Sequence, residues 1–490
     1  MTATPDPTAD PTPTRTLRAT KIVATLGPAS SDPVVLEALI RAGVNVVRLN
    51  FSHGTAADHT ERARAVRAIA EHLGVAVAVM ADLQGPKIRV AAFARGKVML
   101  QPGAPFVLDA ARAAPGDEHG VGLDYADLAR DVKAGDLLLL NDGLIALRVQ
   151  AVKGSAVHTV VEAGGELADH KGINKQGGGL TAPALTDKDR ADIHAAMQLQ
   201  ADYVAVSFPK SAADVALARE LCTKAATPGH VPQLIAKIER AEAVGNLSEI
   251  LAASDGIMVA RGDLAVEVGN AVVPALQKKM ITMARRADKL VITATQMMES
   301  MISAPKPTRA EVSDVANAVL DGTDAVMLSA ETAAGRYPVE TVREMAAICE
   351  AAEENDPIEV DADFNPVALY RIDQSIALGA IFTAYHLGAK AIVALTESGA
   401  TALWMSRQRS RIPIYALTPK LHTLRKLALY RNVHPMRVKT MHGRDDALAQ
   451  AERHLKRQCI VQSGDIYAIT CGEPMGEPGG TNMLKLCRVK

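Results

Sequence analysis

Eight short apolar runs, each ending in polar or charged residues, constrain the fold of this chain more than any other feature. In chain order they cover residues 21–28, 45–54, 76–85, 203–210, 234–240, 256–263, 290–296 and 325–332. Each run is typical of a buried parallel strand, because it is apolar throughout and releases polar side chains only at its carboxyl end. Eight such strands predict a (β/α)8 TIM barrel, in which the polar tails meet at one face and form the active site.

The unequal spacing of these runs predicts how the chain divides into domains. Most gaps hold one amphipathic helix, but the gap after the third run is far longer and shows β-type alternation with Gly turns. We therefore expect a disordered tail (1–16), a barrel (17–86 and 180–355), an inserted all-β cap on the catalytic face (87–179) and a C-terminal doubly wound α/β regulatory domain (356–490). A purely structural role for the insert is the alternative.

Composition argues against several classes of function. The formal net charge is -1 at pH 7, which gives no electrostatic reason to expect nucleic acid or an anionic membrane as the main partner. No segment has the uninterrupted apolar length of a membrane span, and the first residues lack the pattern of a signal peptide. The cysteines are scattered, without a CxxC pair, which fits a reducing compartment. We therefore expect a cytoplasmic protein.

Carboxylates and a lysine at the ends of neighbouring strands indicate the chemistry of the site. Lys237 and Glu239 project to the same side of one strand, and Asp263 follows the next strand. Two carboxylates on adjacent strands can hold Mg²⁺ while leaving positions for water and substrate. With Arg48 at the end of the second run, the site suits a small phosphorylated and carboxylated substrate and phosphoryl transfer. Taken alone, a Lys-x-Glu pair in a strand is more often a salt-bridged or solvated pair.

A series of motifs identifies the family that this chain resembles. In the order found in pyruvate kinase, the chain contains RLNFSHG, DLQGPKIR, KGIN, AKIER, MVARGDLAVE, ATQMMESM and LSAETAAGRYP, and the resemblance runs from about residue 17 to the C-terminus. It implies transfer of the phosphoryl group of phosphoenolpyruvate to ADP, giving pyruvate and ATP in the final step of glycolysis. It also implies Mg²⁺, or Mn²⁺ in its place, as cofactor and a homotetrameric assembly.

The resemblance implies roles for individual side chains. Lys237 matches the group that stabilises charge on the transferring phosphoryl group and on the enolate, and Glu239 and Asp263 match the ligands of Mg²⁺. Arg48 matches the residue that contacts the substrate phosphate. Gly262 and Thr295 match the groups that bind the substrate carboxylate, and Thr295 and Ser329 lie at the positions near the waters beside the enolate. The nucleotide-side positions are Asn50, His53, Arg89 and Lys171. The proton donor to the enolate stays open.

The chain departs from many family members at the end of the third run. Those members read DTKGPEIR where this chain reads DLQGPKIR, and they bind K⁺ with groups that match Asn50, Ser52, Asp82 and the carbonyl of Leu83. The present sequence resembles the bacterial group that does not require K⁺. Because Asp82 faces a trianionic substrate, it needs a nearby positive charge, and we hypothesise that the ammonium group of Lys87 replaces K⁺. The alternative is that Lys87 only pairs with a surface carboxylate.

A loop in the C-terminal domain indicates allosteric regulation. It follows a strand and opens a helix, so that hydroxyl and backbone N–H groups of Thr396, Ser398, Gly399 and Thr401 can hold an effector phosphate. Glu397 stands where animal members activated by fructose 1,6-bisphosphate carry Lys. We therefore expect activation by a sugar monophosphate or by AMP. The alternative is a phosphate loop without an effector.

Two other functions fit parts of this pattern. A Mg²⁺-dependent lyase or aldolase on the same barrel also chelates an enolate with carboxylates on successive strands, but cap residues such as Arg89 and Lys171 argue against it. A catalytically silent metabolite sensor would keep the regulatory domain, whereas Lys237, Glu239 and Asp263 are intact here. Dependence of pyruvate formation on ADP would separate a kinase from both.

Overall fold

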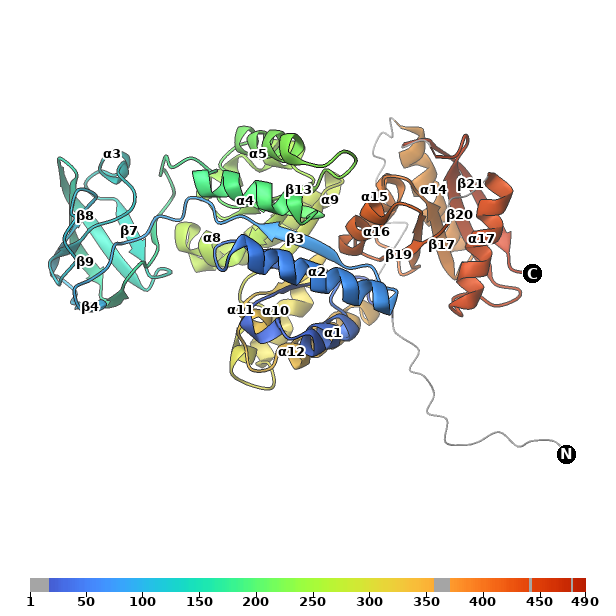
Figure 1. The fold of residues 1–490 in the computed structure, drawn as a ribbon, viewed down its shortest axis with the longest axis horizontal. Coiled ribbons are helices and arrows are strands. Elements are labelled where there is room, and N and C mark those ends of the chain that lie inside the picture. The colour runs from blue at the N-terminus through green and yellow to red at the C-terminus, as the bar shows by residue number, and fades with distance from the viewer. Residues whose placement is uncertain (1–16, 357–370, 440–442, 477–478) are drawn as a thin grey trace.

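A computed structural model describes residues 17–356, 371–439, 443–476 and 479–490, so the tail expected at residues 1–16 lies outside the described residues. A closed barrel of parallel strands lies between the two other parts of the molecule (Figure 1). Its strands are β1 (Lys21–Thr25), β2 (Val46–Asn50), β3 (Ala78–Asp82), β12 (Tyr203–Val206), β13 (Gln233–Ile238), β14 (Gly256–Ala260), β15 (Leu290–Ala294) and β16 (Ala325–Leu328), with β1 paired to β16. The barrel predicted from the apolar runs is therefore confirmed.

Helices between the strands form the outer layer of the barrel. α1 (Pro33–Ala42) begins after Asp32, whose carboxylate accepts a hydrogen bond from the N–H of Val34, and α2 (Ala56–Leu73) begins after Thr55, whose hydroxyl caps it in the same way. The rest of the layer consists of η1 (Pro28–Ser30), α4 (Asp187–Gln198), α5 (Ala212–Ala225), α6 (Ala241–Gly245), α7 (Leu247–Ala253), α8 (Arg261–Val268), η2 (Asn270–Val272), α9 (Val273–Arg286), η3 (Glu299–Ile302), α10 (Arg309–Leu320), α11 (Ala330–Ala333) and α12 (Pro338–Glu354).

The chain leaves the barrel after β3, forms a separate β-rich body and returns at α4 (Figure 1). We call this body the cap. It has its own buried core, which includes Phe106, Leu108 and Leu138. Its six-stranded sheet has the order β11-β7-β8-β9-β5-β6, and β10 pairs with β4. Its elements are β4 (Lys97–Leu100), β5 (Pro105–Asp109), β6 (Gly120–Val121), α3 (Leu128–Asp131), β7 (Leu137–Leu140), β8 (Ile145–Lys153), β9 (Ala156–Ala163), β10 (Gly165–Ala168) and β11 (Ile173–Lys175).

The C-terminal part is built on a five-stranded sheet with the order β19-β18-β17-β20-β21, in which only β21 runs antiparallel. The chain order therefore reverses between β17 and β20, a point at which α/β sheets commonly bind ligands. The strands are β17 (Ala391–Leu395), β18 (Ile414–Thr418), β19 (Val433–Arg437), β20 (Ile466–Gly472) and β21 (Thr481–Arg488), and the helices are α14 (Ile372–His386), α15 (Ala400–Arg407), α16 (Leu421–Lys426), η4 (Leu427–Leu429) and α17 (Arg444–Arg457). The predicted α/β domain is thus confirmed as a fold.

The amino-terminal end of the barrel packs on the C-terminal sheet. Lys21, the first residue of β1, donates a hydrogen bond to the carbonyl of Val433 at 2.7 Å, and the buried guanidinium of Arg407 pairs with the buried carboxylate of Asp324, just before β16. The cap is attached at the opposite end, where the strands finish. In the described residues, no helix combines the length and apolar character that crossing a membrane requires.

Candidate active site

The carboxyl ends of β2, β3 and β13 bring together two cations and two carboxylates. Nε of Arg48 lies 2.5 Å from Oδ2 of Asp82, and Nζ of Lys237 lies 3.3 Å from the other oxygen of the same carboxylate. Nζ of Lys237 also lies 2.8 Å from Oε1 of Glu239. All four side chains are at most 12% exposed, so they form a buried network of alternating charge.

The neighbouring charges in this network set the protonation states of Asp82 and Lys237. Although burial opposes ionisation, the charges of Lys237 and Arg48 hold the pKa of Asp82 below its usual value. Burial likewise acts to lower the pKa of Lys237, but the carboxylates of Asp82 and Glu239 outweigh it and raise that pKa. Lys237 therefore remains a fixed positive charge at neutral pH.

Sequence reasoning missed two hydroxyl groups that orient these cations. Ser207 follows β12 and accepts a hydrogen bond from Nζ of Lys237 at 2.7 Å, while its own hydroxyl donates to the carbonyl of Leu83 at 2.7 Å. Thr25, the last residue of β1, accepts a hydrogen bond from Nη1 of Arg48 at 3.0 Å. Both residues lie in the predicted strand tails, and this position indicated that they are near the site. A hydroxyl group in the sequence does not show which side chain it binds, so their hydrogen bonds to Lys237 and Arg48 could not be predicted.

Glu239 and Asp263 have the chemistry of a magnesium site. Oε2 of Glu239 accepts a hydrogen bond from the N–H of Phe208 at 2.8 Å, and Asp263 lies in the first turn of α8. Burial raises the pKa of Glu239, and the negative charge of Asp263 adds to this effect, so a divalent cation between them would relieve repulsion. In the described residues, no group of three or more His, Cys, Asp or Glu could hold a metal ion.

Lys87 lies beside one of these carboxylates. Its Nζ is 3.3 Å from Oδ1 of Asp263, and both side chains are 28% exposed. A Cβ atom on Gly172 would lie only 3.2 Å from Cε of Lys87, so the lysine side chain passes close to the cap backbone just before β11. Within the described ranges, its ion-pair partner is Asp263 and not Asp82, whose charge is balanced by Arg48 and Lys237.

Gly262 and Thr295 meet at the amino terminus of α8. A Cβ atom on Gly262 would lie 2.8 Å from Cγ2 of Thr295, so any larger residue at this position would crowd the threonine. Thr295 follows β15 with a φ of 75°, a conformation that non-glycine residues rarely adopt. Nη2 of Arg261 donates a hydrogen bond to its carbonyl at 2.7 Å and so holds this turn. Ser329, at the end of β16, donates its N–H to Oε2 of Glu331 at 2.6 Å.

The predicted nucleotide-side residues form two pairs. On the barrel, the N–H of His53 donates to the carbonyl of Asn50 at 3.1 Å, and the N–H of Ser52 donates to Oδ1 of Asn50 at 3.1 Å. On the cap, the backbones of Arg89 and Lys171 lie side by side, because Val90 donates its N–H to the carbonyl of Lys171 at 3.0 Å. In the part of the chain that is described, no hydrogen bond or ion pair joins the two pairs.

Glu267 is a buried carboxyl group at the junction of the barrel and the cap. It lies one turn beyond Asp263 on α8, and its Oε2 accepts a hydrogen bond from the N–H of Ala241 at 2.9 Å. Its backbone carbonyl accepts from Gly177 on the segment that returns from the cap. Burial raises the pKa of Glu267 from 4.5 to about 7. The folded protein therefore binds a proton at this position more tightly than the unfolded chain does.

Replacing Glu267 by glutamine is expected to raise the melting temperature at pH 8 and to change it much less at pH 5. Because the folded pKa is raised, the stability contributed by the protonated carboxyl is present below pH 4.5 and is lost as the pH rises through about 7. The loss amounts to about 3 kcal/mol at most, and neutral glutamine avoids it. Differential scanning calorimetry at both pH values would measure the gain. Glu340→Gln, at an exposed position, is the control, and an equal gain at both pH values would contradict the expectation.

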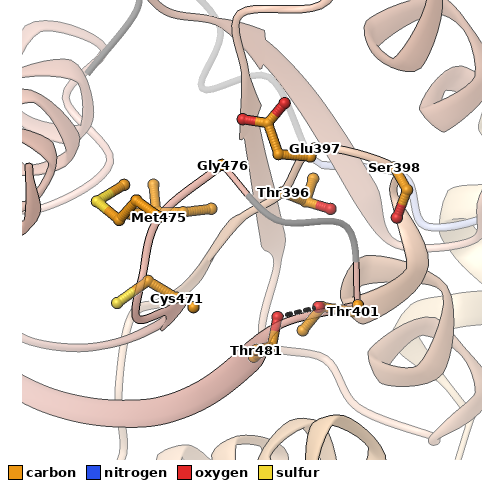
Figure 2. A pocket seen from close by; sticks show the side chains of 11 residues that line it. Thr396, Glu397, Ser398, Thr401, Cys471, Met475, Gly476 and Thr481 are labelled. Carbon is orange, nitrogen blue, oxygen red and sulfur yellow. Dashed lines mark hydrogen bonds between the residues drawn. The ribbon is translucent and has the colours of Figure 1, made fainter. Parts of the chain in front are cut away.

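The predicted effector loop lines a cavity between β17 and β20 (Figure 2). Thr396, Ser398 and Thr401 lie in its wall, and the hydroxyls of Thr401 and Thr481 are 2.7 Å apart across it. Gly399 has a φ of 91° and immediately precedes α15, and its N–H donates to Oγ1 of Thr396 at 2.9 Å. This cavity lies where the strand order of the sheet reverses, which suits ligand binding.

Glu397 also lines this cavity and is paired. Its Oε2 lies 2.8 Å from Nζ of Lys420, and its backbone carbonyl accepts a hydrogen bond from the hydroxyl of Thr423 at 2.8 Å. The ammonium group of Lys420 balances the negative charge of Glu397. Glu397 therefore supplies no positive charge for a second phosphate group at this point of the wall.

Comparisons with known proteins cover almost the whole chain. The family model described as "Pyruvate kinase, barrel domain" matches residues 17–342, and "Pyruvate kinase, alpha/beta domain" matches residues 374–487. The chain is 50% identical to "Pyruvate kinase" of Haemophilus influenzae over 97% of its own length and 98% of the relative's. It is also 50% identical to "Pyruvate kinase II" of Salmonella typhimurium over 97% and 100% of the two lengths. The protein "Pyruvate kinase" of Staphylococcus haemolyticus is 41% identical, and the match covers 96% of this chain and 80% of that protein.

Proposed function

This chain belongs to the pyruvate kinase family, and we propose that the buried network around Lys237 transfers a phosphoryl group from phosphoenolpyruvate to ADP. The observation that carries this proposal is the fixed positive charge of Lys237, held by Asp82, Glu239 and Ser207 at the open end of the barrel. Phosphoryl transfer depends mostly on positioning and on neutralising the charge of oxygen atoms. The relatives give no support to the lyase, aldolase and sensor alternatives.

The substrate side can be described residue by residue. Arg48 and Lys237 bind oxygens of the substrate phosphate, and the hydroxyl of Thr295 with the N–H at Gly262 binds the carboxylate. An oxygen of the β-phosphate of ADP forms a bond to phosphorus while the bond from phosphorus to the enol oxygen breaks. Lys237 stabilises the negative charge that develops on the enolate, which then takes a proton at its methylene carbon near Thr295 and Ser329. The proton donor stays open.

The family generally uses Mg²⁺ together with K⁺. Here Glu239 and Asp263 would hold Mg²⁺, which, when bound, neutralises charge on the phosphoryl oxygens. Asn50 and His53 on the barrel, with Arg89 and Lys171 on the cap, would bind ADP. Closure of the cap would bring its cations over the phosphates and exclude water, which prevents hydrolysis of the transferring group.

The proposed reaction is tested by measuring pyruvate formation with and without ADP. A coupled assay with phosphoenolpyruvate and Mg²⁺ is expected to show a rate that depends on ADP and matches the formation of ATP. Pyruvate formed at the same rate without ADP would indicate a lyase or a phosphatase instead. No turnover under any condition would indicate a sensor.

We further propose that the cavity lined by Ser398 binds a sugar monophosphate or AMP as an activator. The proposal is supported by the hydroxyl groups in its wall and by Glu397, which supplies no positive charge for a second phosphate group. A hexose monophosphate, a pentose monophosphate and AMP are each titrated against phosphoenolpyruvate. At least one is expected to lower the half-saturating concentration about threefold or more, and fructose 1,6-bisphosphate is expected to have less effect.

Ser398→Asp should abolish this activation, because a carboxylate in the wall repels phosphate. Ser463→Asp introduces the same charge at an exposed turn and is the matched control. The activator hypothesis is wrong if no candidate changes the half-saturation of the unmodified protein. The expected homotetramer and the cytoplasmic location also stay predictions, and sedimentation velocity would test the first.

A further inference from the structure

Basic residues make up five of the eight residues that line a second cavity of the C-terminal domain. It has a volume of about 800 Å³ and lies between the carboxyl end of β19 and the helix α17. Its polar walls consist of Arg437, Lys439, Gln450, Arg453, His454 and Arg457. It shares no lining residue with the cavity around Ser398. The proposed reaction and the proposed activator site leave this cavity without a role.

The sequence of α17 explains why its cations face the cavity. Ala447, Ala451 and Leu455 recur every four residues and are fully buried against the sheet. Arg453 and Arg457 lie four residues apart on the neighbouring stripe of the same helix. On β19 and just beyond it, Arg437 and Lys439 are two residues apart and project to the same side, so that the two walls present cations to one space.

Among the described residues, no carboxylate is paired with the four cations of this cavity. In the described residues, none of Arg437, Lys439, Arg453 and Arg457 forms an ion pair or a side-chain hydrogen bond. Like charges at positions i and i+4 destabilise a helix, so Arg453 and Arg457 destabilise α17. A bound anion would remove this repulsion. Burial lowers the pKa of His454, and the positive charges of Arg457 and Arg453 lower it further. A buildup of positive charge without counter-ions inside a hollow is the arrangement that binds anions.

We propose that this cavity is a binding site for a phosphorylated small molecule that carries at least two negative charges. The guanidinium groups supply forked donors that match phosphate oxygens, and the volume exceeds that of inorganic phosphate and suits a nucleoside phosphate or a sugar phosphate. The site lies at the carboxyl ends of β18 and β19, the edge of an α/β sheet at which ligands bind. The near-zero net charge of the whole chain favours a small ligand over a nucleic acid.

Hydrogen–deuterium exchange of the full chain tests this site, with inorganic pyrophosphate as the probe and without Mg²⁺. Because exchange is measured peptide by peptide, it separates this site from the active site and from the cavity around Ser398. Millimolar pyrophosphate is expected to slow exchange in peptides from α17 about threefold or more. The double variant Arg453→Gln/Arg457→Gln should lose this protection, and Arg437→Gln, on the opposite wall, should weaken it. Lys456→Gln removes a charge from the same helix outside the cavity, where Lys456 pairs with Glu452, and should keep it.

Melting temperatures of the unliganded proteins show whether the double variant loses protection because its fold is damaged. The double variant should melt no lower than the unmodified protein, because it removes like charges and no ion pair. Absence of protection in α17 of the unmodified protein would overturn the proposal. Equal protection in the double variant would overturn it as well, because the anion would then bind elsewhere.

Discussion

Replacing Lys237 by methionine is expected to lower kcat of pyruvate formation by about 1000-fold or more. Removal of a single preorganised donor from a site of developing charge typically costs about 100-fold to 1000-fold, and Lys237 would serve both the phosphoryl group and the enolate. Its ammonium group is fixed by three oxygen partners at 2.7 to 3.3 Å and is raised in pKa, so the charge needs no reorganisation during the reaction. The ADP-dependent coupled assay at saturating Mg²⁺ measures the loss.

The same substitution also affects folding, and the experiment has to separate the two effects. Without Lys237, the buried carboxylates of Asp82 and Glu239 lose a counter-charge, and breaking such a pair commonly costs about 3 to 5 kcal/mol. Lys237→Arg retains the charge but moves it on a longer, forked side chain, so it should fold better than Lys237→Met and still be strongly impaired. Lys279→Met, at an exposed position of α9, is the control. A Lys237→Met variant that is folded and retains a tenth of the activity would contradict the proposed role.

The barrel could be predicted from sequence because its signal is local. Each strand is an apolar run that is buried on both faces, and the order of the runs requires nothing beyond chain connectivity. The same reasoning anticipated that Arg48, Lys237 and Glu239 would come close together, because parallel strands end at one face. The structure brings these side chains into one network through Asp82.

The partners of individual side chains could not be predicted in this way. Lys87 contacts Asp263, a residue far away in sequence, and its side chain passes close to Gly172 of the cap. Glu267 acquires its raised pKa from burial at the junction of the barrel and the cap. The basic cavity depends on how α17 packs beside β19, and the spacing of Arg453 and Arg457 alone is also typical of a solvated helix face. Each of these features arises from tertiary packing of loops and helices.

Because Lys87 places an ammonium group beside Asp263, we expect catalysis to proceed without K⁺. We propose that the ammonium group of Lys87 supplies the positive charge that K⁺ supplies elsewhere in the family. It lies 3.3 Å from a proposed metal ligand and is covalently attached to the chain. The rate with Na⁺ or tetramethylammonium as the only monovalent cation should therefore remain within about twofold of the rate with K⁺. A collapse of the rate without K⁺ would exclude this role for Lys87.

Lys87→Met tests whether the charge itself matters. An ammonium group about 5 Å from one negative charge of the substrate contributes about 3 kcal/mol at an effective dielectric of about 20, and partial exposure reduces this value. We therefore expect kcat/KM to fall about 10-fold to 100-fold in tetramethylammonium, and K⁺ to restore part of the loss. Lys97→Met, at an exposed position of the cap where Lys97 pairs with Glu166, should leave the rate unchanged. Unchanged activity of Lys87→Met without K⁺ would mean that Lys87 only pairs with Asp263, and that Arg48 and Lys237 suffice to balance Asp82.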